Sequence, residues 1–360
     1  MAKNKKVHIV GAGLSGLVAA INLARDDYQV IVLDQARKIG DVSPLHPSYH
    51  GTPMNFDLIK NYVGIDVSPC FVRARAVDIY QSPRKYTLTS HELYEVERGP
   101  RETSLDTYLY TLAQELGVEF QFGQVVKDPK DLPDSTIIAT GLFRGMGEAF
   151  NRPLMRLPCY TARRKEPDPN RNATNRIWFG PYTNTYAYGT IMNGIDYLLL
   201  FTDRGDLTSQ DLKRFEEDIE ASDGTRVDNW EYFDVYVPTN TPGAPQLFTD
   251  GKILTGTLSG MMEPGLYFGI HGAIISGKIA ALAVTDPERA VRDFEKFNKA
   301  YKKCWYLHRY LNNPIRLHFF RFFFSNPNIS APLAKFMDNG IPGVDHFFEN
   351  FVTEFAGTYQ

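Results

Sequence analysis

Residues 6–34 of the chain read KVHIVGAGLSGLVAAINLARDDYQVIVLD. The first apolar run stops at a glycine, apolar residues then recur at helical spacing, and a second β-branched run ends in an acidic residue. Gly11, Gly13 and Gly16 lie between the first run and the helical segment, and Asp34 ends the second run. This order predicts a strand, a glycine turn, a helix and a parallel strand, which together form one βαβ unit.

The glycine turn has the GxGxxG spacing of a dinucleotide-binding site. We expect Gly11 to permit the tight turn, Gly13 to let a pyrophosphate approach the backbone, and Gly16 to let helix and strand pack closely. The helix N-terminus would attract the anion, and Asp34 would accept hydrogen bonds from ribose hydroxyls. FAD and NAD share this fingerprint, so the motif alone leaves the choice between them open.

Composition and charge exclude several classes of function. The chain of 360 residues has a formal net charge of −3, so it lacks the basic field that collects nucleic-acid phosphates. Residues 1–10 have the charged-then-apolar order of a signal peptide, but the apolar stretch runs into the glycine turn, and we assign it to the fold. No uninterrupted apolar run approaches the about 18 residues that a membrane-spanning helix needs.

Cysteine and histidine patterns indicate no metal site. Cys70, Cys159 and Cys304 are far apart and form no CxxC motif, which argues against a disulfide framework and against zinc. His46 and His50 have metal-like spacing only within a helix, and the proline between them opposes one. We therefore expect no metal ligands, a buried structural role for Cys70, and a reducing, cytoplasmic compartment.

Hydrophobic periodicity and turn residues predict further elements along the chain. Residues 161–176 are polar and basic, and we expect them to form an exposed loop. Residues 177–237 have the aromatic and β-branched character of an antiparallel layer. The remaining patterns predict short strands over 71–97, helices over 56–62, 104–116, 208–221 and 271–284, strands over 118–122, 136–140 and 252–254, and a long helix from Pro287.

These elements define an α/β fold in which a Rossmann-type domain carries an inserted, mostly antiparallel β substrate domain and a helical C-terminal tail. The chain leaves the first domain and returns to it twice. The predicted divisions are 1–70, 101–160 and 246–285 for the three parts of the Rossmann domain, 71–100 for substrate-side strands, 161–245 for the β layer, and 286–360 for the helical and aromatic tail.

Several later segments extend the dinucleotide pattern. Arg101 stands just before a predicted helix, and Val126 follows the strand after it. Residues 137–141 read IIATG, and residues 253–257 read ILTGT before a Gly-rich approach to another helix. With the glycine turn, these segments resemble the glutathione-reductase-type flavoproteins in their geranylgeranyl reductase and p-hydroxybenzoate hydroxylase-like branch, over roughly residues 5–285.

The resemblance implies FAD as the cofactor and a substrate pocket between the β layer and the flavin. No second GxGxxG unit is visible, so NAD(P)H would act only as a transient reductant. The residues that the resemblance and the turn assign to FAD are Gly11, Gly13, Ser15, Gly16, Asp34, Gln35, Arg37, Arg101, Val126, Ala139, Gly141, Gly256, Thr257, Gly269 and Ile270.

One of these residues departs from the family pattern. The family carries Asp after the glycine of its second FAD segment, and Thr257 stands there in this chain. A threonine hydroxyl still donates or accepts a hydrogen bond, but it supplies no carboxylate. The substitution leaves open whether FAD is held weakly or not at all.

Three functions are therefore compared. The first is an FAD-dependent oxidoreductase that moves hydride between flavin and a hydrophobic small molecule, such as a polyprenyl or lipid-like substrate. The second is an FAD-dependent aromatic monooxygenase. The third, from another class, is a non-redox protein that binds a prenylated or lipid ligand, because Rab escort and GDP-dissociation-inhibitor proteins resemble the same architecture.

Candidate catalytic residues cluster near the start of the predicted helix 271–284. His271 lies next to the helix start, where it would donate a proton near a reduced flavin or serve as a hydrogen-bonded capping residue. Glu263 and Tyr267 belong to the turn before it and are candidates for the same chemistry.

The tail contains an aromatic and basic segment at residues 315–325. Arg316–Phe324 reads RLHFFRFFF, which is typical of a helix that dips into a bilayer surface and equally of one that packs on its own domain. The first interpretation predicts peripheral contact with the inner face of a membrane. Oligomeric state is not readable from the pattern.

Overall fold

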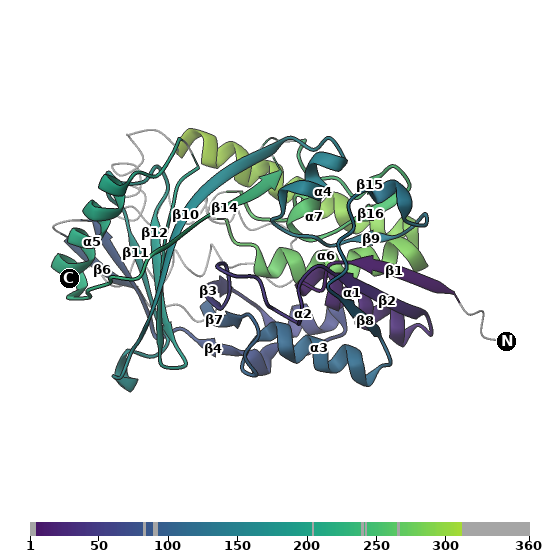
Figure 1. Cartoon of the computed structure of the whole chain (residues 1–360), viewed down its shortest axis with the longest axis horizontal. Coiled ribbons are helices and arrows are strands. Elements are labelled where there is room, and N and C mark those ends of the chain that lie inside the picture. The colour runs from purple at the N-terminus through teal and green to yellow at the C-terminus, as the bar shows by residue number, and fades with distance from the viewer. Residues whose placement is uncertain are drawn as a thin grey trace, which may run out of the picture.

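The protein is described by a computed structural model, which covers residues 5–81, 84–88, 93–203, 205–238, 241, 243–264 and 267–311. Figure 1 shows a mostly parallel sheet with its helices on the right, a large twisted sheet on the left, and a small sheet below the centre. The helix α6 (Ile270–Thr285) lies between the two larger sheets.

The sheet on the right is the Rossmann sheet, with six strands in the order β15-β16-β9-β1-β2-β8. All neighbours are parallel except β15 and β16. Parallel strands buried on both faces are expected to be short apolar runs, as the sequence pattern indicated. The strands are β1 (Lys6–Val10), β2 (Gln29–Asp34), β8 (Glu119–Phe122), β9 (Ile137–Ile138), β15 (Phe248–Thr249) and β16 (Lys252–Leu254).

Helices cover this sheet and bury its apolar face. The helix α1 packs on both α6 and α3, and the three share one core with β1 and β2. Polar residues begin four of the helices: Asn55 caps α2, Ser104 caps α3, Thr208 forms a capping box on α5, and the Asp286 carboxylate accepts the Arg289 amide at the start of α7. The helices are α1 (Leu14–Arg25), α2 (Phe56–Val63), α3 (Leu105–Glu115), α4 (Arg144–Ala149), α5 (Ser209–Asp223), α6 and α7 (Pro287–Leu311).

The sheet on the left has seven strands in the order β14-β10-β13-β12-β11-β5-β6. Its neighbours are antiparallel except for β11 and β5. The strands are β5 (Ala76–Gln81), β6 (Arg84–Leu88), β10 (Leu154–Lys165), β11 (Thr174–Trp178), β12 (Ala187–Met192), β13 (Ile195–Phe201) and β14 (Glu231–Pro238).

A third, antiparallel sheet in the order β3-β7-β4 lies against β12. Its strands are β3 (Ser48–Pro53), β4 (Phe71–Arg73) and β7 (Leu93–Arg98). Short 3₁₀ turns complete the chain at Ser68–Cys70, Pro129–Asp131, Pro169–Arg171 and Gly256–Ser259. The predicted α/β class, with a Rossmann sheet, a mostly antiparallel second sheet and C-terminal helices, is confirmed.

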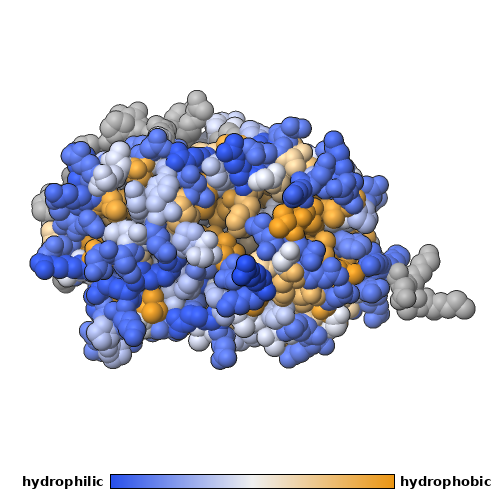
Figure 2. All heavy atoms as spheres, in the orientation of Figure 1, coloured by the Kyte–Doolittle hydropathy of each residue, from blue (hydrophilic) through white to orange (hydrophobic). Residues whose placement is uncertain are grey.

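The sheets cut across two of the predicted divisions. The strand β10 begins at Leu154, ahead of the predicted division at residue 160, and β5 and β6 join the large sheet from the 71–100 segment. The tail segment at 315–325 lies outside the described residues, so both interpretations of it stay predictions. Among the described helices, none is long and apolar enough to cross a membrane. On the face in Figure 2, apolar side chains gather between the two large sheets.

The expected exposed loop at residues 161–176 is wrong. Half of that segment belongs to β10 and β11, and its arginines are paired rather than solvated. The Arg176 side chain is 1% exposed and bridges Asp196 and Asp223. Its guanidinium carbon lies 5.3 Å from the centroid of the Trp178 ring. Charge counting missed this because Asp196 comes from β13, two strands away in the sheet, and Asp223 from the end of α5, and only the folded structure brings them close to Arg176.

A buried ionisable side chain lies between the large and the small sheet. Glu95 on β7 is fully buried, and neither carboxylate oxygen has a hydrogen-bond partner. Burial raises the pKa of Glu95 from 4.5 to about 8, with Thr190 and Arg176 opposing the shift. The Glu95 side chain is therefore mainly protonated and neutral near pH 7.

Replacing Arg176 with leucine is expected to lower the free energy of unfolding by about 3–5 kcal/mol, because two carboxylates lose a buried partner. Arg226, whose side chain is 83% exposed beside Glu220, provides the control, and Arg226→Leu should cost less than about 1 kcal/mol. Urea titrations of both variants measure the difference. Equal costs would contradict a structural role for the buried pair.

Glu95→Gln is expected to change how stability depends on pH. The folded pKa of Glu95 lies above the unfolded value, so its contribution to stability is fully present below about pH 4.5 and is lost as pH rises toward 8. Between about pH 5 and pH 7, wild type should lose roughly 3 kcal/mol relative to the glutamine variant. Parallel pH series of denaturant unfolding test this, and superimposable curves would show that Glu95 titrates normally.

Candidate functional site

The glycine turn after β1 brings three backbone segments together. Gly11 has a φ of 107°, and a Cβ there would lie 2.4 Å from the Ala139 carbonyl oxygen. A Cβ on Gly16 would lie 2.0 Å from the Gly11 carbonyl oxygen. Only glycine fits at these two positions without moving the backbone. Gly13 differs, because a Cβ there would meet nothing within 4 Å and would point into open space.

The start of α1 is available to an anion. Gly13 is its N-cap, no side chain caps the helix, and its first turn holds no acidic residue. The unpaired amides and the helix dipole therefore favour negative charge beside the open side of Gly13. This is the geometry that a pyrophosphate requires.

Asp34 ties the end of β2 to this turn. Its carboxylate accepts the Ala12 amide at 2.6 Å and the Ala36 amide at 2.7 Å. Each oxygen keeps a lone pair for a further donor, so a ribose hydroxyl remains compatible with these bonds. Gln35 and Arg37 follow on the exposed loop after β2.

The ends of β9 and β16 complete the same edge. The Ala139 amide donates to the Val10 carbonyl, and Gly141 has a φ of 66° with open space around it. Gly256 is buried with a φ of 65°, and a Cβ there would lie 2.7 Å from Ser15 Oγ. Thr257 follows it, half-buried in the Gly256–Ser259 turn. The glycine turn and the predicted FAD segment at residues 253–257 thus meet at Ser15.

Of two further predicted cofactor residues, Val126 lies at this edge and Arg101 contacts the small sheet. Val126 packs, half-buried, on a cluster that contains Val10 and Ile138, at the carboxyl ends of β1 and β9. Arg101 lies after β7, where its guanidinium donates to the Tyr49 hydroxyl at 2.6 Å and pairs with Glu97 at 3.1 Å. Its guanidinium is therefore already engaged by the small sheet.

The helix α6 connects the glycine turn to a cavity. The Ser276 hydroxyl accepts the Gly256 amide at 2.9 Å, and a Cβ on Gly277 would lie 2.5 Å from the Ser15 carbonyl oxygen. At its other end, Gly269 and Ile270 line the cavity. Six helical residues separate Ile270 from Ser276, which is about 9 Å. The N-terminus of α6 also lacks a side-chain cap and an acidic first turn.

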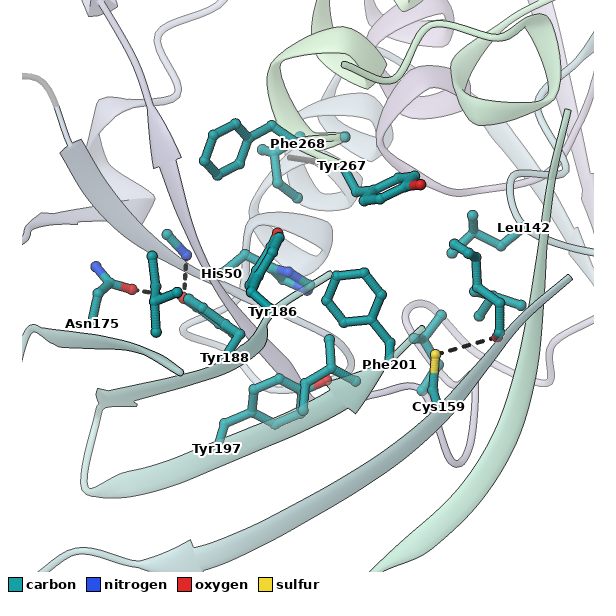
Figure 3. A pocket seen from close by; sticks show the side chains of 18 of the residues that line it. His50, Leu142, Cys159, Asn175, Tyr186, Tyr188, Tyr197, Phe201, Tyr267 and Phe268 are labelled. Atoms are coloured by element: carbon teal, nitrogen blue, oxygen red, sulfur yellow. Dashed lines mark hydrogen bonds between the residues drawn. The ribbon is translucent and has the colours of Figure 1, made fainter. Parts of the chain in front are cut away.

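The cavity has a volume of about 200 Å³ and lies between the large sheet, the small sheet and the start of α6. Figure 3 shows Tyr267 and Phe268 on one side, Asn175 and Tyr188 on a second, and Leu142 with Cys159 on a third. The remaining lining is mainly aliphatic and aromatic: Leu45, His50, Gly51, Val77, Leu93, Leu157, Ile177, Phe179, Tyr186, Tyr197, Leu199, Phe201, Phe233, Val235, Gly269 and Ile270.

Two of the three candidate catalytic residues are buried away from the cavity wall. His271 is 1% exposed, its Nδ1 has no hydrogen-bond partner, and burial lowers its pKa to about 4. The imidazole is therefore neutral at pH 7, and no side chain caps α6 by a hydrogen bond. Glu263 is 6% exposed, and its charge adds to burial in raising the pKa of Tyr301 on α7. Neither residue lines the cavity.

Tyr267 does line the cavity. Its ring lies edge-on to Phe201, with 5.8 Å between the centroids, and its hydroxyl donates to Asp203 at 3.2 Å. Its φ of 61° is uncommon for a residue with a side chain. Such backbone geometry is found where the surrounding structure holds a side chain in place.

The histidines near the cavity are uncharged. His46 Nδ1 and His50 Nε2 lie 2.9 Å and 2.8 Å from the same Ser48 hydroxyl. Burial and the nearby Arg98 charge lower the pKa of both to about 3. Cys159 donates its thiol to the Leu157 carbonyl, and burial raises its pKa far above its usual value. The thiol is therefore an unreactive part of the wall.

Sequence reasoning missed the polar residues of the β layer. Asn175 fell within the expected exposed loop, and Tyr188 was one of many aromatic residues in a β pattern. Alternation along β11 and β12 would have placed each on a face of a strand. It would not have shown which face covers the cavity, because that depends on how the two sheets pack.

The family model of the NAD(P)-binding Rossmann-like domain matches residues 9–57. This region contains the glycine turn and Asp34. By sequence, no curated protein matches the chain.

Solved structures of similar shape cover most of the chain. A geranylgeranyl bacteriochlorophyll reductase-like protein from Thermoplasma acidophilum is 18% identical with a TM-score of 0.64, over 86% of this chain and 88% of that chain. The protein CtdE in complex with FAD is 13% identical with a TM-score of 0.60, over 87% and 94%. The p-nitrophenol 4-monooxygenase from Pseudomonas putida is 11% identical with a TM-score of 0.59, over 86% and 89%.

At these identities the similarity concerns the fold. It agrees with the Rossmann sheet, the antiparallel layer and the connecting helix described above. The chain therefore has the fold shared by geranylgeranyl reductase-like and FAD-dependent monooxygenase flavoproteins.

Proposed function

We propose that the protein is an FAD-dependent oxidoreductase that acts on a hydrophobic small molecule held in the cavity. The observation that carries this proposal is the position of α6, whose N-terminus lines the cavity and whose middle packs on the glycine turn. A dinucleotide on the turn and a substrate in the cavity would be about two helical turns apart. One cofactor of FAD length would then reach both.

The residues at the edge of the Rossmann sheet fit FAD. Gly13 and Gly141 leave open space where a phosphate or ribityl group needs close approach, and α1 presents uncapped amides. The uncapped start of α6 would stabilise negative charge near the flavin ring. When bound, FAD supplies hydride exchange with a substrate carbon.

The side chains of the cavity would bind and orient the substrate and exclude water from it. The walls of the cavity are aliphatic and aromatic, so an apolar substrate would be desolvated on entry. Tyr267 and Phe201 would position a flat or chain-like group beside the α6 terminus. We favour reduction of a carbon–carbon double bond in a polyprenyl or lipid-like molecule, with NAD(P)H as a transient external reductant.

Aromatic hydroxylation is the second candidate. The aromatic lining of the cavity suits a ring substrate, and p-nitrophenol 4-monooxygenase has the same fold. Incubation with an aromatic substrate and isotopically labelled dioxygen separates the two: a monooxygenase incorporates the label, and a reductase does not.

A non-redox role as a carrier of a prenylated or lipid ligand rests on Thr257, which replaces the acidic residue of the flavoprotein pattern. The hydroxyl at this position provides no charge to the cofactor. This role predicts a protein that never binds flavin.

The purified protein is expected to contain FAD or to take it up. An absorption spectrum should show the flavin bands, and heat release followed by chromatography should identify FAD in stoichiometric amount. A colourless protein that remains so after incubation with FAD would exclude the oxidoreductase and favour the carrier role.

Gly13→Ala is expected to weaken FAD binding tenfold or more without lowering stability. The new methyl group meets nothing in the protein and the backbone φ of −77° suits alanine, but it fills the space that a pyrophosphate would occupy. Titration with FAD, followed by flavin fluorescence, measures the affinity.

Gly145→Ala on α4 is the matched control, because its Cβ also meets nothing within 4 Å. It should leave FAD affinity unchanged. If both alanine variants bind FAD like wild type, the pyrophosphate does not lie against Gly13.

A further inference from the structure

A serine hydroxyl joins two histidines beside the cavity. His46 Nδ1 and His50 Nε2 lie 2.9 Å and 2.8 Å from Ser48 Oγ, so the three side chains form one hydrogen-bonded row. Ser48 and His50 are two residues apart on β3 and share one face of the strand. His46 belongs to the loop just before β3. The row therefore runs from the small sheet into that loop.

The two ends of the row have different surroundings. His50 lines the cavity, and its ring points from β3 into it (Figure 3). Because its Nε2 is bonded to Ser48, Nδ1 is the nitrogen left for a ligand, and it is not enclosed by protein as His271 Nδ1 is. His46 is half-buried but does not line the cavity, so its exposed part lies outside the cavity. The row thus crosses the cavity wall.

The single hydroxyl hydrogen of Ser48 makes the row directional. If both rings donated to Ser48 Oγ, its hydrogen would lack an acceptor among the described residues, and the side chain is fully buried. If both rings accepted, one nitrogen lone pair would face the oxygen with no hydrogen between them. One ring therefore donates to Ser48, and the other accepts from it.

This rule couples the tautomers of the two rings. When His50 Nε2 donates to Ser48, Ser48 donates to His46 Nδ1, and both rings carry their hydrogen on Nε2. When His46 Nδ1 donates to Ser48, Ser48 donates to His50 Nε2, and both rings carry it on Nδ1. In the first state His50 Nδ1 accepts a hydrogen bond from the cavity, and in the second it donates one.

Neither ring holds a charge near pH 7. Burial and the Arg98 charge lower the pKa of both imidazoles to about 3, and Arg163 on β10 adds to the shift at His46. The Asp106 carboxylate opposes the shift at both rings, but it is paired with Arg98 through hydrogen bonds of 2.7 Å and 2.8 Å. A proton therefore enters the row only as another leaves it.

The loop that carries His46 is held by one arginine of the large sheet. Arg163 donates to three carbonyls of this loop, at 2.5 Å for Pro47, 2.5 Å for Pro44 and 3.2 Å for Leu45. The outer ring is therefore fixed by the large sheet while it contacts the small one.

We propose that His50, Ser48 and His46 form a proton relay that delivers a proton from His50 Nδ1 to a substrate in the cavity. As that proton leaves, the Ser48 hydrogen moves to His50 Nε2 and the His46 Nδ1 hydrogen moves to Ser48. His46 Nε2 then takes a proton from water, so one proton enters, one leaves and both rings stay neutral. The inference rests on the proposed function, because reduction of a double bond adds a hydride to one atom and needs a proton for its neighbour.

The tautomers of the wild-type protein without FAD are the first test. Two-bond ¹H–¹⁵N NMR spectra of ¹⁵N-histidine-labelled protein at pH 7 show which nitrogen of each ring carries the hydrogen. The variants His46→Gln and His50→Gln assign the signals. Both rings should be neutral and share one tautomer, or one mixture of the two. Opposite tautomers or a charged ring overturn the relay.

Neutral probes in the cavity test whether its two ends communicate. The cavity of about 200 Å³ admits a bicyclic molecule, since about 150 Å³ holds benzene. Indanone only accepts a hydrogen bond, the indole N–H only donates one, and indane does neither. Indanone should draw both rings to the Nδ1–H form, indole should draw both to the Nε2–H form, and indane should change neither.

The response of His46 identifies the relay, because His46 does not line the cavity. A tautomer change at His50 without the same change at His46 overturns the relay. Absence of any change at His50 with both indanone and indole overturns the delivery of a proton to the cavity.

Ser48→Ala interrupts the row, and Thr52→Val is its matched control. Each removes one fully buried hydroxyl from β3, but Thr52 Oγ1 has no hydrogen-bond partner. In Ser48→Ala, indanone should still shift the His50 tautomer and no longer shift that of His46. In Thr52→Val both rings should respond as in wild type. Coupling that survives in Ser48→Ala contradicts transfer through the hydroxyl.

Titration of the same samples with FAD keeps the two proposals apart. If the protein binds FAD but the rings have opposite tautomers, the relay fails and the oxidoreductase stands. If no flavin binds but both rings follow the probes, the oxidoreductase fails and the relay stands as a property of the cavity.

Discussion

Close backbone contact at Gly11 is the constraint on which the rest of the molecule depends. The turn brings the end of β1 within reach of Ala139 at the end of β9 and of Gly16 in the first turn of α1. Any side chain at Gly11 or Gly16 would separate these segments. Because the contact aligns the carboxyl ends of the central strands, it also fixes where a ligand of the sheet edge binds.

The helix α6 extends this arrangement beyond the Rossmann sheet. It packs on α1 through Gly277, accepts the Gly256 amide through Ser276, and ends at the cavity with Gly269 and Ile270. One rigid element thus relates two sites of different character, an anion-binding edge and an apolar cavity. Redox enzymes need this combination, since the cofactor and the substrate must be held in a constant relative position.

The β layer carries unusual internal charge for a sheet that covers an apolar cavity. Arg176 pairs with two carboxylates, whereas Glu95, on β7 of the adjoining small sheet, has no hydrogen-bond partner and is kept neutral by burial. Asn175, next to Arg176 on β11, also has a buried side-chain nitrogen without a hydrogen-bond partner. The paired charges anchor α5 to the sheet, because Asp223 at the end of α5 bonds Arg176 on β11.

The sequence by itself determined the fold class, the glycine turn and most helices and strands. These depend on local signals: glycine spacing, hydrophobic period, and capping residues such as Ser104 and Asp286. It also indicated the FAD segments, whose predicted glycines meet at Ser15. Only the tertiary structure decided which arginines are buried and that His271 and Glu263 lie away from the cavity. Those properties depend on partners distant in the chain, as with Gly51 and Tyr188, which are 137 residues apart. Local patterns do not specify how two sheets pack, and packing decides which polar group is left unpaired.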